Sequence, residues 1–213
     1  MKKTSLICFV LLIILISAKC AKETKSSKNI SNQIFVNQSL VNQPTNWGKL
    51  KCGLYINKNA EIGFEDYKSS EKSAIIEKYY ITHFGFNDFK EKSLKQVIDT
   101  ATFRKLGNTY YKDKNHIYHF YGMAGGGQFY VFDKADYDTF EVLSDCYTKD
   151  KNNIYEARSG KLDSVDYQTF KTKKDLSACV AKDKYGYIIW NERATKDHLE
   201  DEYTQKAIKE LDK

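Results

Sequence analysis

Cysteine is the residue type whose positions in this sequence most directly suggest chemistry. The chain contains Cys8, Cys20, Cys52, Cys146 and Cys179. The last two each lie four residues before the aspartate of a Lys-Asp-Lys segment. Equivalent positions in neighbouring copies of one motif can lie side by side, and thiols pair in oxidising compartments. We therefore predict a disulfide between Cys146 and Cys179, with two buried free thiols as the alternative.

Histidines and acidic residues are the other groups that could bind a metal. His116 and His119 are three residues apart on a predicted strand, so their side chains point to opposite faces and cannot readily share a metal. Aspartates at both ends of residues 133–136 and 163–166 could offer oxygen ligands to calcium. However, no loop has the central glycine and terminal glutamate of an EF-hand. Turn and capping roles explain these aspartates, and we predict neither a metal nor a cofactor.

Motifs typical of enzymes are missing from the sequence. There is no Gly-x-Ser-x-Gly motif and no cysteine–histidine arrangement that indicates a nucleophile. The three glycines at residues 125–127 lack the following Lys-Ser/Thr of a phosphate loop, and we expect them to turn a hairpin. Trp47 and Trp190 could form a sugar- or protein-binding face, although core packing is the favoured role. We therefore predict no catalytic residues and a protein that is not an enzyme.

The N-terminus has the pattern of an export signal. Lys2 and Lys3 precede an apolar run from Leu6 to Ile16, and small residues follow it. As a helix this run would reach only about 16 Å at 1.5 Å per residue, whereas a hydrocarbon core is about 30 Å thick. We therefore predict a signal peptide over residues 1–19 rather than a permanent transmembrane helix.

Cys20 lies where lipoprotein signal peptides place their acceptor cysteine. Residues 16–20, Ile-Ser-Ala-Lys-Cys, resemble a lipobox but carry Lys19 where a small residue is usual. We predict that Cys20 is lipidated and anchors the protein to a membrane of the bacterial cell envelope. The alternative is a secreted or periplasmic soluble protein in which Cys20 is an ordinary thiol. Lipidation would leave three cysteines and one unpaired, whereas a free Cys20 would allow two disulfides.

The charge of the exported chain is small. The sequence has 34 basic and 28 acidic residues, and the predicted signal peptide removes three lysines and no acid, which leaves a net charge of +3. This net charge is too small to indicate binding to nucleic acid. Residues 20–46 are polar, with an Asn-Gln pair every five residues from residue 32, and we expect a flexible tether there.

The most specific feature of the sequence is an internal repeat over about residues 97–191. One copy begins at Asp99 with Asp-x-x-Thr-Phe-x-x-Leu and ends in Lys-Asp-Lys-Asn at residues 112–115. A second begins 37 residues later at Asp136, without a gap, and a third begins at Asp166. The third copy has three extra residues and ends at residues 182–184, where Tyr-Gly replaces the asparagine. A weaker echo lies at residues 55–59.

Each half of the repeat predicts a local structure. Asp-Lys-Asn between aromatic segments indicates the tip of a β-hairpin, because Asp and Asn favour turns. The segment from Asp136 to Leu143 indicates a short helical turn with Asp136 as its N-cap. A strand is expected within residues 74–86. Residues 199, 203, 207 and 211 predict an apolar stripe on a C-terminal helix that starts near Thr195.

These elements predict one domain over residues 47–213. Its expected class is α+β, mainly β, built from tandem units of an antiparallel hairpin plus a short helix, with a C-terminal helix. The repeats resemble the DKNYY family of bacterial proteins, which are known mainly as exported or lipid-anchored proteins of undefined activity. The resemblance rests on residues 112–118, 149–155, 182–184 and the three Thr-Phe segments. It implies fold and compartment and supplies no catalytic residues.

The favoured function is therefore a cell-envelope lipoprotein that binds another macromolecule, with a protein of the envelope as a possible partner. A toxin-neutralising immunity protein is one alternative, and an envelope enzyme of unknown class is the other.

Overall fold

The structure is a computed structural model that describes residues 47–69, 76–107 and 109–213. The predicted signal peptide, Cys20 and the predicted tether lie outside these residues. Within them, no helix is both long and apolar enough to cross a membrane.

The described chain begins with an antiparallel sheet. Its strands follow in order: β1 (Gly48–Lys49), β2 (Leu54–Ile56), β3 (Ile62–Ser69) and β4 (Ile76–Ile81). The last of these confirms the strand expected within residues 74–86. The weak echo of the repeat is the tip of the β2–β3 hairpin, where the Asn57 side chain accepts the backbone N–H groups of Asn59 and Glu61. A short 3-10 helix (Asn87–Phe89) and α1 (Leu94–Val97) lead to the repeats.

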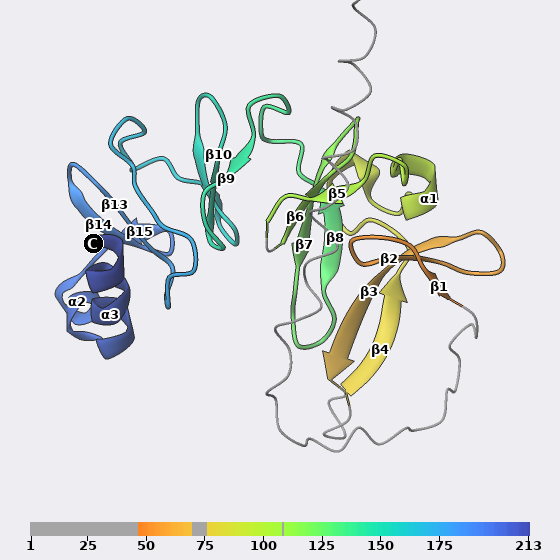
Figure 1. The fold of residues 1–213 in the computed structure, drawn as a ribbon, viewed down its shortest axis with the longest axis horizontal. Helices are drawn as coiled ribbons and strands as arrows, with labels where there is room; N and C mark the ends of the chain where they lie inside the picture. The colour runs from red at the N-terminus through yellow and green to blue at the C-terminus, as the bar shows by residue number, and fades with distance from the viewer. Residues whose placement is uncertain (1–46, 70–75, 108) are drawn as a thin grey trace, which may run out of the picture.

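Three further antiparallel sheets correspond to the three repeats and follow one another along the molecule (Figure 1). The first contains β5 (Arg104–Lys105), β6 (Tyr110–Lys112), β7 (Ile117–Tyr121) and β8 (Gln128–Val131). The second contains β9 (Glu141–Val142), β10 (Tyr147–Lys149), β11 (Ile154–Glu156) and β12 (Gly160–Lys161). The third contains β13 (Val180–Asp183), β14 (Gly186–Ile189) and β15 (Glu192–Arg193). The predicted mainly β class with hairpin repeats is confirmed.

Each repeat contains two aspartates that are joined by a hydrogen bond. The turn aspartates, Asp99, Asp136 and Asp166, accept the backbone N–H and hydroxyl of the threonine three residues later. This is the predicted capped turn, and it spans a single turn of chain before the next strand or bridge. The hairpin aspartates, Asp113, Asp150 and Asp183, receive the backbone N–H of the turn aspartates at 2.7, 2.8 and 2.7 Å.

Each hairpin aspartate also organises its own hairpin tip. Asp150 accepts the backbone N–H groups of Asn152 and Asn153 and the hydroxyl of Tyr155. The first repeat has the same arrangement around Asp113. In the third repeat, Arg193 binds Asp183 through two N–H···O contacts of 2.6 Å. A guanidinium therefore takes the place of the tyrosine hydroxyl in the repeat whose motif departs from the pattern.

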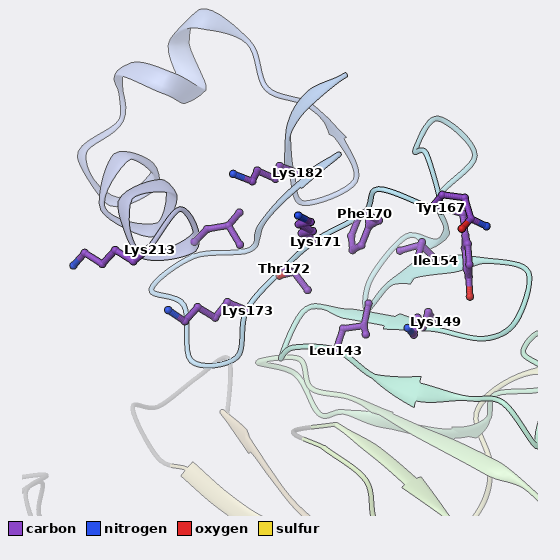
Figure 2. A pocket seen from close by; sticks show the side chains of 12 residues that line it. Leu143, Lys149, Ile154, Tyr167, Phe170, Lys171, Thr172, Lys173, Lys182 and Lys213 are labelled. Carbon is purple, nitrogen blue, oxygen red and sulfur yellow. The ribbon is translucent and has the colours of Figure 1, made fainter. Parts of the chain in front are cut away.

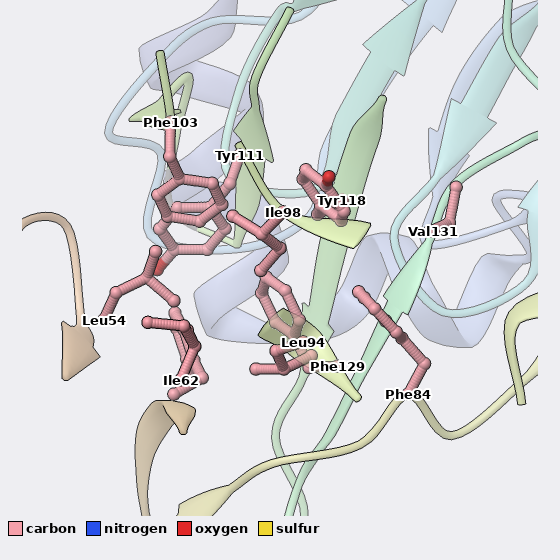
Figure 3. Close-up of a cluster of buried hydrophobic side chains, with 11 residues drawn as sticks. Leu54, Ile62, Phe84, Leu94, Ile98, Phe103, Tyr111, Tyr118, Phe129 and Val131 are labelled. Atoms are coloured by element: carbon pink, nitrogen blue, oxygen red, sulfur yellow. The ribbon is translucent and has the colours of Figure 1, made fainter. Parts of the chain in front are cut away.

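The hydrophobic core lies between successive sheets. The first two sheets share the largest cluster, in which the Phe64 ring lies 4.6 Å from that of Phe129 and 5.2 Å from that of Tyr111. Figure 3 shows this cluster, with Leu54 and Ile62 on one side. Smaller clusters join each repeat to the next and the last repeat to the C-terminal helices. Because each unit buries its apolar face against its neighbours, the repeats stack as a short array.

The C-terminal helix is present, but it is broken. Thr195 caps α2 (Lys196–Glu200), as predicted, and Asp201 then adopts an extended conformation and caps α3 (Glu202–Leu211). The predicted apolar stripe is therefore wrong in its first half. Leu199 and Tyr203 are exposed, whereas Ala207 is buried against β13 and β14. The break at Asp201 separates Leu199 from the helix that carries Ala207, and Tyr203 lies in the exposed first turn of α3.

Candidate functional site

The predicted disulfide between Cys146 and Cys179 is present. The two Cα atoms lie 5.6 Å apart, and the residues are 33 positions apart in the sequence. Cys146 lies directly before β10 and Cys179 directly before β13, so the bond ties the second repeat to the third. Cys52 is disulfide-bonded as well.

The histidines do not form a metal site. His119 is 1% exposed on β7, with Nδ1 2.6 Å from the Tyr130 hydroxyl and Nε2 3.1 Å from the Thr109 hydroxyl. Burial lowers the pKa of His119 from 6.5 to about 4. No group of three histidine, cysteine or acidic side chains within the described ranges could hold a metal ion.

The aspartates proposed above as possible calcium ligands act in turns and ion pairs. Lys151 lies 2.8 Å from Asp136, and this contact lowers the pKa of Asp136 to about 2. Lys114 and Lys184 pair with Asp99 and Asp166 in the same way, at 2.9 and 2.7 Å. The repeated Asp–Lys pairs therefore stabilise the hairpins. The glycines at residues 125–127 lie in the loop between β7 and β8, as predicted.

An open groove of about 600 Å³ lies between the second repeat and the C-terminal part of the chain (Figure 2). Its lining is Leu143, Lys149, Ile154, Tyr167, Gln168, Phe170, Lys171, Thr172, Lys173, Lys182, Leu211 and Lys213. We call it the lysine groove, because five lysines and no acidic side chain line it. Figure 2 shows Leu143, Ile154 and Phe170 together on one side, with Lys173, Lys182 and Lys213 on the other.

The local structure holds the lysine groove in shape. The backbones of Lys171 and Lys182 exchange two hydrogen bonds of 2.7 and 2.8 Å. The Thr172 hydroxyl donates to the Val180 carbonyl at 2.9 Å. The segment that carries Lys171 and Lys173 is thus bound to β13, while Phe170 packs into the core shared by the second and third repeats.

Acidic neighbours neutralise part of the charge of the groove. Lys149 lies 3.1 Å from Glu141, and Lys182 pairs with Asp212. The Asp212 contact raises the pKa of Lys182, so this lysine stays protonated. Lys171 and Lys213 make no ion pair within the residues that the structure describes. These two cations and the apolar side of the groove are therefore available to an incoming group.

The repeated lysine of the hairpin motif is a signal in the sequence for this groove. Lys112, Lys149 and Lys182 occupy the same position, directly before each hairpin aspartate. In the first repeat, Lys112 is buried and its ammonium group lies 3.6 Å from the centre of the Tyr137 ring. In the other two repeats, the equivalent lysines line the groove. The residues that pack against each lysine therefore differ: Tyr137 of the second repeat for Lys112, and Asp212 near the C-terminus for Lys182.

The lining of the groove suits the binding of anions. Lysine ammonium groups are flexible point charges that attract carboxylates and other anions without a strict geometry. The groove presents no cysteine, serine, histidine or acidic side chain that could act as a nucleophile or general base. No family model, no curated protein and no solved structure matches this chain, so the resemblance to the DKNYY family stays a prediction.

Proposed function

We propose that the protein is a non-enzymatic binding module that holds an acidic segment of another protein in the lysine groove. The observation that carries this proposal is the combination of cationic side chains with an apolar wall in one groove. Carboxylates of the segment would contact Lys171 and Lys213, and its apolar side chains would contact Phe170 and Leu143. Complementary charge would speed and orient the encounter, and the apolar contacts would slow dissociation.

The test compares charge reversals inside and outside the groove. The purified chain, carrying an affinity tag, would be used to capture partners from the native envelope fraction. The double variant Lys171→Glu/Lys173→Glu reverses two exposed groove charges, and Lys134→Glu/Lys206→Glu makes the same change in net charge elsewhere. We expect the groove variant to weaken binding by about tenfold or more, because like charges then face each other. The control variant should bind normally.

Two results would refute this proposal. One is equal binding by the groove variant and its control. The other is binding that does not weaken as the Debye length falls from about 30 Å at 0.01 M salt to about 3 Å at 1 M. The second result would indicate contacts that do not depend on charge.

Anchoring in the cell envelope through lipidated Cys20 is part of the same proposal. A thioether to a lipid uses the Cys20 sulfur, so one molecule cannot also hold that sulfur in a disulfide. Because signal cleavage would remove Cys8, Cys20 would be the remaining candidate partner for the disulfide-bonded Cys52. Mass spectrometry of the mature protein decides between the two states. Firm membrane attachment of a Cys20→Ala variant would exclude the lipid anchor.

A further inference from the structure

A second, smaller cavity of about 370 Å³ lies where the turns after β11 and β14 meet. Glu156, Arg158, Ser159, Trp190 and Asn191 line it. None of these residues belongs to the lysine groove. The volume lies at the lower end of the range of about 300–1,000 Å³ that is usual for small-molecule sites.

Trp190 supplies the aromatic wall of this cavity. Its side chain is 42% exposed, and its backbone is left-handed, with a φ angle of 57°. A left-handed backbone is costly for a bulky residue, and such residues concentrate at functional sites. The backbone N–H of Trp190 donates to the Cys179 carbonyl at 2.9 Å, and the Trp190 carbonyl accepts the Tyr147 hydroxyl at 2.8 Å. The tryptophan is therefore held in place next to the disulfide.

Trp47 differs from Trp190. Its ring stacks on Tyr80 with 4.4 Å between the ring centres, and the same ring lies against Gly63. The sequence favours core packing for both tryptophans. The structure confirms packing for Trp47 and leaves a large part of Trp190 open to solvent.

Glu156 supplies an acceptor that the fold uses only in part. The residue is 2% exposed, and Oε2 accepts the Arg158 N–H at 2.9 Å and the N–H and hydroxyl of Ser159 at 2.8 Å each. Oε1 is buried and has no hydrogen-bond partner among the described residues. Oε2 thus stabilises the turn, while Oε1 can still accept a hydrogen bond. A buried acceptor without a partner is unfavourable, and a ligand donor that reaches it would offset that cost.

The charges of the cavity favour a neutral ligand. The Arg158 guanidinium lies 4.8 Å from the centre of the Trp190 ring, and its positive charge balances that of Glu156. Ser159 and Asn191 add neutral donors and acceptors. The Arg158 side chain is exposed and long. It can therefore move off the indole face when a ligand binds and still donate hydrogen bonds to the edge of that ligand.

We propose that this cavity binds a neutral pyranose ring, either as a free sugar or as one residue of a glycan. The apolar C–H face of the sugar would stack on Trp190, which presents a flat apolar surface. Sugar hydroxyls would donate to Glu156 and accept from Arg158 and Asn191. Hydroxyl groups suit this site because each can both donate and accept. Sugar binding in this cavity does not require the lysine groove or its acidic partner.

The test uses tryptophan fluorescence of the purified full chain in a Trp47→Phe background, where Trp190 is the remaining indole. The probes are glucose, N-acetylglucosamine and the β-1,4-linked trimer of N-acetylglucosamine. We expect a saturable change with at least one probe and a dissociation constant of about 1 mM or lower. If only the trimer binds, the ligand is one residue of a glycan. If a monosaccharide binds, the site accepts a free sugar.

Variants followed by calorimetry locate the binding. Trp190→Asn removes the ring but tolerates the left-handed backbone, so the fold should persist and binding should be lost. Glu156→Gln should weaken binding about tenfold, and Arg158→Ala provides a second, exposed variant if Glu156→Gln unfolds. The Lys171→Glu/Lys173→Glu groove variant should bind sugar normally. The proposal is overturned if none of the three probes saturates, or if binding survives Trp190→Asn.

Discussion

Acidification should destabilise the protein through His119 before the ion-paired Asp99, Asp136 and Asp183 are protonated. The ring is buried, stacked 4.3 Å from Tyr110, and has a pKa lowered by burial to about 4. In the unfolded chain, His119 should titrate near its ordinary value of about 6.5. Between these two values the unfolded state binds more protons than the folded state, so the free energy of unfolding falls as the pH falls.

The magnitude follows from these two pKa values. A group with a pKa of 6.5 when unfolded and about 4 when folded lowers the free energy of unfolding by about 2 kcal/mol between pH 7 and pH 4.5. Three ion-paired aspartates contribute little in this window. Lys114 and Lys151 lower the pKa values of Asp99 and Asp136 to about 2, and Arg193 does the same for Asp183. Stability from these aspartates is present above their unfolded values and is lost only at still lower pH.

The assay is urea denaturation of the wild type and His119→Gln at about pH 7 and about pH 4.5. Glutamine retains a donor and an acceptor for Tyr130 and Thr109 but does not titrate. The other histidines are unchanged in the variant, so their effects cancel in the comparison. We expect the wild type to lose about 2 kcal/mol more than the variant. Equal losses in the two proteins would refute the reasoning.

Two further predictions concern the links within and between the repeats. Replacing both Cys146 and Cys179 by serine should lower the free energy of unfolding by about 3–4 kcal/mol, because the disulfide closes a loop of 33 residues; unchanged urea midpoints would contradict this. Asp150→Asn removes a buried charged acceptor of several hydrogen bonds and should cost about 2–3 kcal/mol. Exposed Asp138→Asn is the matched control, and equal melting temperatures for the two would rule out the predicted role of Asp150.

The sequence alone predicted the parts of the fold that depend on local geometry. An aspartate that caps a turn or closes a hairpin binds backbone groups two or three residues away, so Asp136 and Asp150 could be assigned from spacing. The disulfide also followed from the repeat, because Cys146 and Cys179 hold one position in successive copies.

The tertiary structure decided what neighbouring units do to equivalent residues. One position of the repeat carries His119 in the first copy and Glu156 in the second; the first is buried among aromatic rings, and the second lines a cavity. Lys112 packs on a tyrosine, whereas Lys182 lines the groove. Sequence spacing fixes the direction of a side chain within its own hairpin. Its burial and partners depend on contacts with the next unit, which the local pattern does not contain.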